Sequence, residues 1–479
     1  MKRLNTALAL LGLAILITVG AAVLFFQSYS GKEANDGALA ALAPVPSNQQ
    51  GTPGTPVEWH PASGSRYPMC DAAFDPEAYP KPGMRVIEAN TGWLFRQEEL
   101  SLHYQFPDDE VYPFVSRLTE RLSQTGTRLT VLISPPRLVL AREHLASLEG
   151  YDRDVVKGVL IQYLNMQRRL QENGALTPDI LEEANLQGIP WDQLADPADL
   201  HWTPTGAKMT ADAIARITDR DPRTKDAQPV KYVMSRVNEP LPVSGYYDIL
   251  NSICGEDFPF PTIRPFAPPE RIASSSALMS EQKNLSAVIA GTSFSALDHR
   301  FNFAGFLGES TGLEVVNVSL AGGGPLQALG QYISSGSLER DKPAFLIWEM
   351  SPTGLPARDD LNQLNGYLQA DCGKPIKATR KFTWGESTLF DSASVVRLDA
   401  GPAALTITSD NPALKKFIVR SLNYDGSNKK YDVDFSRTPE PPASYRLQLN
   451  SLAGIRAITI EPAGMLSGTI EAELCSVPS

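Results

Sequence analysis

Two short segments of this sequence carry the three side chains needed to activate a serine hydroxyl. D-L-H-W at 199–202 contains Asp199 and His201, and G-T-S-F-S at 291–295 contains Ser293. A histidine can take the serine proton, while a carboxylate fixes the imidazole tautomer and stabilises the imidazolium. Since the chain has only five histidines, few other residues are available as the base. These side chains predict serine-dependent acyl transfer.

The serine lies where a buried strand is expected to end. An apolar run at 286–290 leads into Gly291, whose small size lets the backbone turn and expose the next hydroxyl. Active groups of α/β proteins lie beyond the carboxyl ends of such strands. G-x-S alone is a weak signal, with a plain turn as the alternative. Ser295 competes with Ser293 but falls further into the following segment, so we prefer Ser293.

The acid and the base lie just before a predicted helix. Thr203 can cap a helix with Pro204 at its first position, which leaves Asp199 and His201 in the preceding loop. Two positions apart in an extended segment, their side chains project to the same side. A capping aspartate and a surface histidine are the alternative interpretation.

The elements that must position these residues alternate between strands and helices. Short unbroken apolar runs predict strands at 129–134, 286–290, 314–318 and 345–349, and 154–171 has helical periodicity. This alternation predicts a parallel α/β sheet covered on both faces. After about residue 373 the pattern changes, and no convincing helix separates the next strands. Those strands are expected at 405–408, 417–420, 445–449 and 457–460, as in an all-β sandwich.

Composition and the N-terminus limit the function classes. The net charge of −11 over 479 residues argues against a nucleic-acid binder. Residues 6–26 carry no charge and follow Lys2 and Arg3, which favours an uncleaved membrane anchor and export of the rest. We expect four parts: an anchor or signal segment at 1–30, a flexible linker at 31–66, an α/β domain at 67–372 and a β-sandwich at 373–479.

The four cysteines predict disulfides, because an exported chain meets an oxidising compartment. Cys70, Cys254, Cys372 and Cys475 are too widely spaced for a C-x-x-C zinc pattern. Three pairings are possible, and free buried thiols are the alternative. We favour Cys70–Cys254 with Cys372–Cys475, because each bridge then stays within one domain.

Four motifs bring a known family into view. T-G-W-L-F at 91–95, D-L-H-W-T-P at 199–204, G-T-S-F-S at 291–295 and I-W-E at 347–349 together resemble the alginate O-acetylation proteins of the AlgX/AlgJ family. The resemblance covers about residues 67–479, and the β domain favours the two-domain, AlgX-like type. It implies an SGNH-hydrolase-like α/β domain with permuted motif order, followed by a carbohydrate-binding β-sandwich.

The resemblance also implies a triad of Asp199, His201 and Ser293. The G-x-N-D element of ordinary SGNH esterases is missing, so the backbone N–H groups of Ser293 and Gly323 are our candidate oxyanion donors. Gly323 belongs to a glycine run at 321–324 that follows a predicted strand, where a plain turn is equally compatible.

The expected function is polysaccharide O-acetylation in exopolysaccharide biosynthesis, in the periplasm and tethered to the inner membrane. The resemblance implies no metal or diffusible cofactor, and a membrane-bound O-acyltransferase as the acetyl source. The alternatives are a polysaccharide acetylesterase with the same triad, and a non-catalytic polysaccharide-binding export scaffold.

The predicted polymer site lies at the start of the β domain. An anionic polymer such as a polyuronate would be attracted to a basic cluster there, which comprises Lys374, Lys377, Arg380 and Lys381. A second basic group comprises Lys415, Lys416, Arg420, Lys429 and Lys430. A solvated face without a ligand is as good an explanation for both. Trp384 and Tyr424 could stack on sugars, but isolated aromatics in a sandwich are more often core.

Overall fold

The computed structural model describes most of the chain after Pro61. The described ranges are 60–61, 70–89, 92–100, 109–149, 151–225, 227–243, 245–255, 262–272, 285–357, 360–368, 374–436 and 444–477. The predicted membrane segment at 6–26 lies outside these ranges, as does most of the predicted linker. Within them, no helix is both long enough and apolar enough to cross a membrane.

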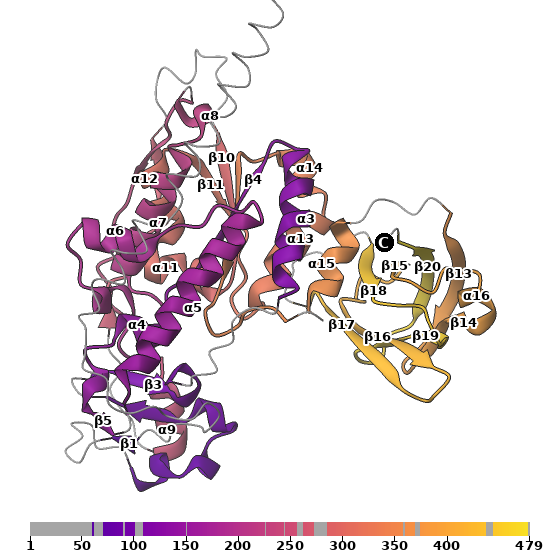
Figure 1. The fold of residues 1–479 in the computed structure, drawn as a ribbon, viewed down its shortest axis with the longest axis horizontal. Helices are drawn as coiled ribbons and strands as arrows, with labels where there is room; N and C mark the ends of the chain where they lie inside the picture. Colours follow the sequence, from indigo (N-terminus) through magenta and orange to yellow (C-terminus); the bar gives the residue numbers. More distant parts are fainter. Residues whose placement is uncertain are drawn as a thin grey trace, which may run out of the picture. The chain divides into compact units, whose positions relative to one another are not determined.

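A four-stranded parallel sheet is the centre of the α/β region, with the order β11-β10-β12-β4 (Figure 1). Its strands are β4 (Arg128–Ile133), β10 (Ser286–Ala290), β11 (Glu314–Asn317) and β12 (Phe345–Met350). All four were predicted to within a residue at each end. Every residue of β12 is buried, as expected of a strand covered on both faces.

Helices cover both faces of this sheet. The larger ones are α3 (Val111–Ser123), α5 (Arg153–Glu172), α6 (Ile180–Leu186), α7 (Pro204–Thr218), α12 (Phe303–Thr311), α13 (Gly324–Ser334) and α15 (Leu361–Leu368). The prediction of a helix over 154–171 is confirmed by α5. Helices α7 and α12 pack on each other, while α3 and α13 pack against α15. Figure 1 shows the sheet between these two groups.

Helix α7 begins as its sequence predicts. The Thr203 hydroxyl accepts from the Gly206 N–H at 3.0 Å, and Pro204 occupies the first helical position. This cap ends the preceding loop, because Thr203 has an extended backbone while the next residue is helical. The Thr203 N–H also donates to the Leu194 carbonyl at 3.0 Å. The loop carrying Asp199 and His201 is therefore tied down on its C-terminal side.

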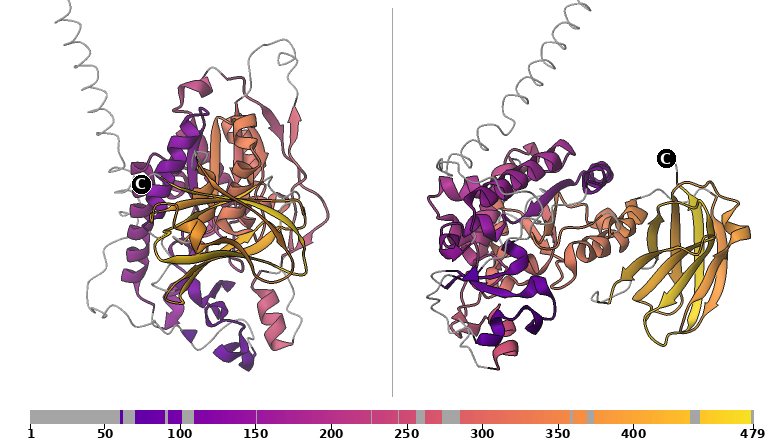
Figure 2. Two further views of the ribbon diagram at one scale, coloured as in Figure 1. Left: turned by 90° about the vertical axis from the view of Figure 1, so that its right-hand side faces the viewer. Right: turned by 60° about the horizontal axis from the view of Figure 1, so that its bottom comes forward.

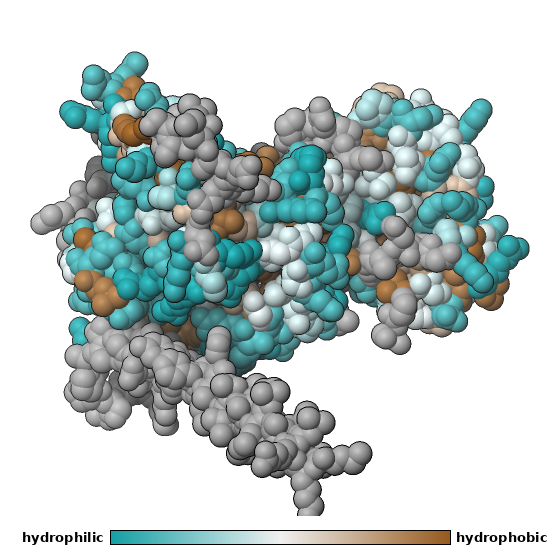
Figure 3. Space-filling model, turned by 90° about the horizontal axis from the view of Figure 1, so that it is seen from above, coloured by the Kyte–Doolittle hydropathy of each residue, from teal (hydrophilic) through white to brown (hydrophobic). Residues whose placement is uncertain are grey.

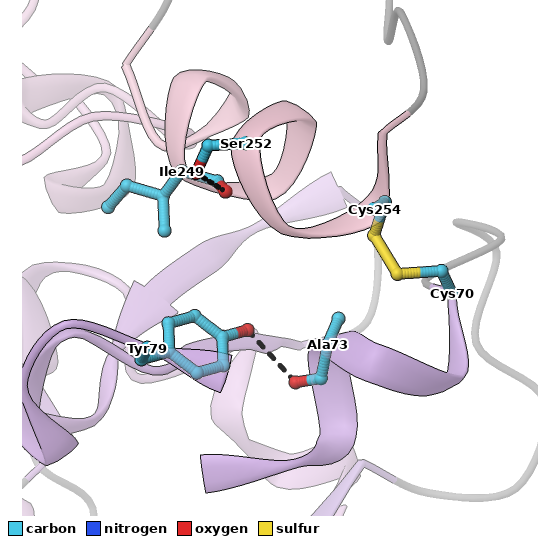
Figure 4. The surroundings of a disulfide bond; sticks show 6 residues. All are labelled: Cys70, Ala73, Tyr79, Ile249, Ser252 and Cys254. Carbon is cyan, nitrogen blue, oxygen red and sulfur yellow. Dashed lines mark hydrogen bonds between the residues drawn. A yellow bond between two sulfur atoms is a disulfide. The ribbon is translucent and has the colours of Figure 1, made fainter. Parts of the chain in front are cut away.

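A disulfide joins the two ends of a long segment. Cys70 is bonded to Cys254 at the end of α9 (Tyr247–Cys254), as predicted (Figure 4). Beneath it the Tyr79 hydroxyl donates to the Ala73 carbonyl at 2.9 Å. Cys475 is disulfide-bonded as well, and Cys372, its predicted partner, lies outside the described residues. The Cys372–Cys475 pairing stays a prediction.

Short two-stranded ladders complete the α/β region. They are β1 (His60–Pro61) with β5 (Leu148–Glu149), β2 (Val86–Glu88) with β3 (Leu94–Arg96), β6 (Lys231–Val233) with β9 (Glu270–Ile272), and β7 (Leu241–Pro242) with β8 (Thr262–Ile263). β1 falls inside the predicted flexible linker. That part of the linker is paired with the globular region, which composition alone did not indicate.

The C-terminal region is an all-β sandwich, as predicted, with two four-stranded antiparallel sheets visible in Figure 2. One sheet contains, in order, β13 (Ile376–Phe382), β20 (Gly468–Ser476), β15 (Ala403–Ser409) and β18 (Tyr445–Leu449). The other contains β14 (Ser387–Asp391), β19 (Ile455–Pro462), β16 (Lys416–Asn423) and β17 (Asn428–Asp434). A one-turn helix, α16 (Ser392–Val395), lies between β14 and β15, ahead of the four strands that were predicted, and starts where the Asp391 carboxylate caps the Ser394 N–H.

Candidate active site

Ser293 is held on a tight turn after the second strand of the parallel sheet. Strand β10 ends at Ala290, and Ser293 opens the one-turn helix α10 (Ser293–Ala296) three residues later. Thr292 is its N-cap, with an extended backbone. Ser293 is half-buried, whereas Ser295 is fully buried and hydrogen-bonded to Glu349. The preference for Ser293 over Ser295 agrees with this difference in exposure.

His201 reaches Ser293 across the end of the sheet. Its Nε2 lies 2.8 Å from the Ser293 hydroxyl oxygen, although the two residues are 92 positions apart. The imidazole is 8% exposed and packs against the rings of Phe294 and Phe301, with centroid distances of 4.8 and 5.4 Å. These contacts restrict the orientation of the imidazole ring, which is the kind of fixed geometry that a chemical step needs.

Asp199 completes a continuous chain of hydrogen bonds. Its Oδ1 lies 3.0 Å from His201 Nδ1 and also accepts from the Leu200 N–H at 2.7 Å. With a carboxylate facing Nδ1, that nitrogen carries the proton and Nε2 is free to accept from the Ser293 hydroxyl. The predicted acid, base and hydroxyl are therefore brought together in the order that acyl transfer requires.

Arg300, which sequence reasoning missed, binds the other oxygen of the acid. It belongs to α11 (Asp298–Phe301), and its Nη2 donates to Asp199 Oδ2 at 2.8 Å. Burial alone would raise the pKa of Asp199, but the hydrogen bonds and charges of His201 and Arg300 outweigh it and hold this pKa well below its usual range. The acid is therefore kept ionised. Nothing in the spacing of Asp199 and Arg300, 101 residues apart, indicated this pair.

Arg137, a second missed residue, anchors the loop that carries the acid and base. Its Nη2 donates to the carbonyls of Asp196 at 2.7 Å and Leu94 at 3.1 Å, and its Nη1 pairs with Glu99 at 2.9 Å. Arg137 is 3% exposed and shares the lining of a pocket with His201. The sequence offered one signal for Arg137: it directly follows Pro135 and Pro136, which end the strand predicted at 129–134.

The two candidate oxyanion donors differ in their surroundings. Ser293 is the first residue of α10, and the first N–H groups of a helix have no acceptor within that helix. The Gly323 N–H instead donates to the Leu320 carbonyl at 3.1 Å. That turn lies beside the segment that leads into Ser293, because the Leu320 N–H donates to the Gly291 carbonyl at 3.0 Å. Ser293 is the better placed donor, and Gly323 would have to exchange its turn bond to serve.

The predicted basic cluster lies on an edge strand among acidic residues. Lys377, on β13, is paired across the sheet with Glu473 of β20, and their side chains form an ion pair at 2.5 Å. Lys374, Arg380 and Lys381 are exposed. The cluster is therefore a mixed surface with three cations that have no ion pair among the described residues, rather than a purely basic one.

Most of the second basic group is paired with acids. Lys416 contacts Asp434 at 2.6 Å, Lys430 contacts Asp432 at 3.0 Å, and Arg420 contacts Glu461. Hydrophilic residues cover most of the face drawn in Figure 3, with hydrophobic ones in small separate groups. A polyanion would therefore have to compete with acidic partners for the cations at Lys416, Lys430 and Arg420.

The interpretation of Trp384 and Tyr424 as core is wrong. Their exposed fractions are 73% and 68%, because both lie in loops that connect strands. Strands β14 and β16 are both antiparallel to β19, so they run in the same direction. Trp384 precedes β14 and therefore lies towards the end of the sheet at which β16 starts. Tyr424 follows the end of β16, so the two aromatics lie at opposite ends of the sandwich. A single sugar could contact only one of them.

Among the residues that the structure describes, no three His, Cys, Asp or Glu side chains lie close enough to hold a metal ion. The candidate site comprises Asp199, His201 and Ser293. Arg300 contacts Asp199, and Glu349 contacts Thr292 in the turn that carries Ser293.

Known proteins resemble this chain in sequence and in structure. The alginate biosynthesis protein AlgX of Pseudomonas fluorescens is 25% identical over 428 residues, which cover 85% of this chain and 87% of that protein. The probable alginate O-acetylase AlgJ of Azotobacter vinelandii is 26% identical over 303 residues, 60% of this chain and 73% of that protein. The structure of AlgX from Pseudomonas aeruginosa matches with a TM-score of 0.70 at 22% identity, and covers 86% of this chain and 100% of that one.

The fold similarity confirms the predicted class, an SGNH-hydrolase-like domain followed by antiparallel β-sheets. A family model described as the SGNH hydrolase-like domain of the acetyltransferase AlgX matches residues 86–352. That range is more than half of the chain and includes Asp199, His201 and Ser293. The chain therefore belongs to the AlgX family of SGNH hydrolase-like acetyltransferases.

Proposed function

We propose that this protein is a polysaccharide O-acetyltransferase that carries acetyl on Ser293 during exopolysaccharide biosynthesis. The observation that carries the proposal is the hydrogen-bonded chain from Asp199 through His201 to Ser293, at 3.0 and 2.8 Å, at the carboxyl end of β10. Membership of the AlgX family and relatives named alginate biosynthesis protein and probable alginate O-acetylase support acetyl as the group and alginate-like polymers as acceptors.

In the first half-reaction the Ser293 oxygen attacks the carbonyl carbon of an acetyl donor. His201 Nε2 takes the hydroxyl proton, and Asp199 stabilises the resulting imidazolium through Nδ1–H. The Ser293 N–H, at the start of α10, is the proposed donor to the oxyanion. When the intermediate collapses, the bond to the donor's leaving group breaks and His201 returns the proton to that group. Acetyl-serine remains.

In the second half-reaction a sugar hydroxyl attacks the acetyl-serine. His201 takes the sugar proton, the new ester bond forms, and the bond to the Ser293 oxygen breaks. His201 then protonates that oxygen, so the enzyme returns to its starting state with atoms and charge balanced. If water replaces the sugar in this step, the same groups make an acetylesterase.

We further propose a division of labour between two domains, at 67–372 and 373–479. The first performs acetyl transfer, and the second holds an anionic, polyuronate-like polymer near it. The candidates for polymer binding are Lys374, Lys377, Arg380 and Lys381. Support comes from the exposure of Arg380 and Lys381 on β13, and from the long-range attraction between cations and a polyanion.

The acetyl source is proposed from the resemblance to the AlgX family, and the membrane tether from the N-terminal sequence. The protein acts outside the cytoplasm, as the alginate biosynthesis relatives suggest. We propose that a membrane-bound O-acyltransferase delivers the acetyl group, and that residues 1–30 tether the protein to the inner membrane. The uncharged run at 6–26 behind Lys2 and Arg3 supports the tether.

The test uses the full chain with a polyuronate acceptor and a chromogenic acetyl ester as donor. We expect wild-type protein to acetylate the polymer and Ser293→Ala to abolish transfer, with an unchanged melting temperature. Ser252→Ala, which removes an exposed serine of α9, is the matched control. Release of chromophore without polymer acetylation would favour the esterase. Unchanged polymer acetylation by Ser293→Ala would refute the proposed mechanism. A wild-type protein that neither releases chromophore nor acetylates the polymer would favour a scaffold.

A further inference from the structure

Glu349 is a buried acid directly beneath the turn that carries Ser293. It lies near the end of β12, where the register pairs Trp348 with Ala290 at the end of β10. Glu349 is therefore next to the residues that follow β10, and it is 1% exposed. The sequence analysis noted it within I-W-E at 347–349 without giving it a role.

Among the described residues, every hydrogen bond that Glu349 accepts comes from the Ser293 turn. Its Oε2 accepts from the Thr292 N–H at 2.7 Å and from the Ser295 hydroxyl at 3.0 Å. The Thr292 hydroxyl donates to both carboxylate oxygens, at 2.9 and 3.1 Å. One carboxyl group thus holds three donors, and these donors lie on either side of the nucleophile in the sequence.

Other buried acids of the chain are balanced differently. Glu99 is paired with Arg137 at 2.9 Å and Glu183 with Arg216 at 2.7 Å, and each acid is at most 3% exposed. Among the described residues, neither lysine nor arginine forms an ion pair with Glu349. A buried carboxyl group without a cation is costly unless hydrogen bonds satisfy it. Burial raises the pKa of Glu349, and the bonds from Thr292 and Ser295 oppose that rise.

The fit between Glu349 and the turn is also steric. A Cβ atom on Gly291 would lie 2.7 Å from Glu349 Cβ, a distance that real Cβ atoms essentially never show. The backbone that leads into the turn therefore rests on the Glu349 side chain. Hydrogen bonds and contact together leave the turn little freedom.

We propose that Glu349 is a positioning residue that fixes the Thr292–Ser295 turn and so directs the Ser293 hydroxyl at His201. This inference rests on the proposed role of Ser293 as the nucleophile. Glu349 transfers no proton in the reaction. It acts as an acceptor that holds the turn in one geometry, and displacement of a reacting group by about 1 Å can cost about 10²-fold in rate.

The test measures the rate at which phenylmethylsulfonyl fluoride labels Ser293, with the adduct located by mass spectrometry. We expect Glu349→Ala to slow labelling by about 10²-fold. Glu349→Gln keeps an acceptor for the Thr292 N–H and should lose less than about tenfold. Thr292→Val and Ser295→Ala should each lose a few-fold, and should add little to Glu349→Ala, because residues of one network are not additive. Glu183→Gln, at a buried acid paired with Arg216, should leave labelling unchanged.

Amide hydrogen exchange of the peptide that contains Thr292 gives an independent readout. Glu349→Ala should speed its exchange, and Glu349→Gln should change it little. The inference is overturned if Glu349→Ala, with a normal melting temperature, keeps wild-type labelling or wild-type exchange. If Glu349→Ala does not fold, wild-type labelling by the Thr292→Val/Ser295→Ala double variant overturns it. A wild-type protein that is not labelled at Ser293 refutes the proposed nucleophile, while the exchange data still decide whether Glu349 orders the turn.

Discussion

The acyl-transfer site and the outer face of the β-sandwich use charged residues in opposite ways. At the candidate site, Asp199 and Glu349 are at most 4% exposed. Asp199 is hydrogen-bonded to His201 and Arg300, and Glu349 accepts from the turn that carries Ser293. On the sandwich, Arg380 and Lys381 are exposed, and Trp384 is 73% exposed. The first arrangement fixes geometry, whereas the second leaves side chains free to adapt.

This difference suits two different tasks. A chemical step gains most from groups held in place before the substrate binds. A polymer slides past many equivalent positions, so attraction by mobile surface charges is sufficient and falls with salt. Substitutions at the site should therefore reduce the rate of ester hydrolysis without affecting polymer binding. Substitutions on the sandwich should weaken polymer binding without affecting that rate.

The largest effect is expected from Ser293→Ala and His201→Ala in the site. Each should reduce hydrolysis of a small acetyl ester by roughly 10³-fold or more. The double variant should be little worse than either single variant, because groups that act as a unit are not additive. Steady-state kinetics on the four proteins measures this. Losses that multiply in the double variant would show that the two residues do not share one mechanism.

Arg300→Gln should have the next largest effect. Without the guanidinium, the pKa of Asp199 rises towards its usual range, since a nearby cation favours the ionised form. Asp199 acts in its ionised form, so a higher pKa of Asp199 should move the acid limb of the pH–rate profile to higher pH. We expect a loss of roughly tenfold at neutral pH, which is partly restored by Arg300→Lys. If Arg300→Gln lowers the melting temperature but leaves the pH–rate profile unchanged, Arg300 stabilises the fold and does not act on Asp199 in the reaction.

Charge reversal on the sandwich should have a smaller effect, and on another quantity. The triple variant Lys377→Glu/Arg380→Glu/Lys381→Glu should weaken polyuronate binding by several-fold at low salt, with less difference at high salt. Hydrolysis of the small ester should stay unchanged. Binding isotherms at two salt concentrations, beside ester kinetics, measure both. If ester hydrolysis falls in parallel with binding, the cluster supports the fold rather than the polymer.

The smallest effect separates the two exposed aromatics. Trp384 follows the strand that carries the basic cluster, whereas Tyr424 lies at the opposite end of the sandwich. Trp384→Ala should weaken polymer binding a few-fold, and Tyr424→Ala should leave it unchanged. Equal losses from both variants would mean that the polymer runs along the length of the sandwich instead of crossing one end.

The sequence predicted most of the framework because its signals are local. Unbroken apolar runs gave the four parallel strands, and the Thr203-Pro204 pair gave the start of α7. Strands β13, β14, β17 and β20 of the sandwich were not predicted, since exposed positions interrupt their apolar residues. Edge and half-exposed strands lack the continuous pattern that identifies buried ones.

The three residues of the candidate site could be predicted from the sequence, but the residues that hold them in place could not. Asp199, His201 and Ser293 lie in local contexts that expose them, so type and spacing were sufficient. Arg300 and Glu349 act through contacts over 101 and 57 residues, and such contacts depend on strand register. The exposure of Trp384 likewise depends on a loop, which side-chain type alone could not reveal.

The Cys70–Cys254 bond divides the proposed machinery by order of synthesis. The loop that it closes contains Asp199 and His201, whereas Ser293 comes after it in the chain. An oxidase that acts on the polypeptide as it emerges from the membrane can close the ring that contains Asp199 and His201 before Ser293 has emerged. Maturation would then be ordered: the ring closes first, and the parallel sheet is completed afterwards, when β12 pairs with β4 and β10 pairs with β12.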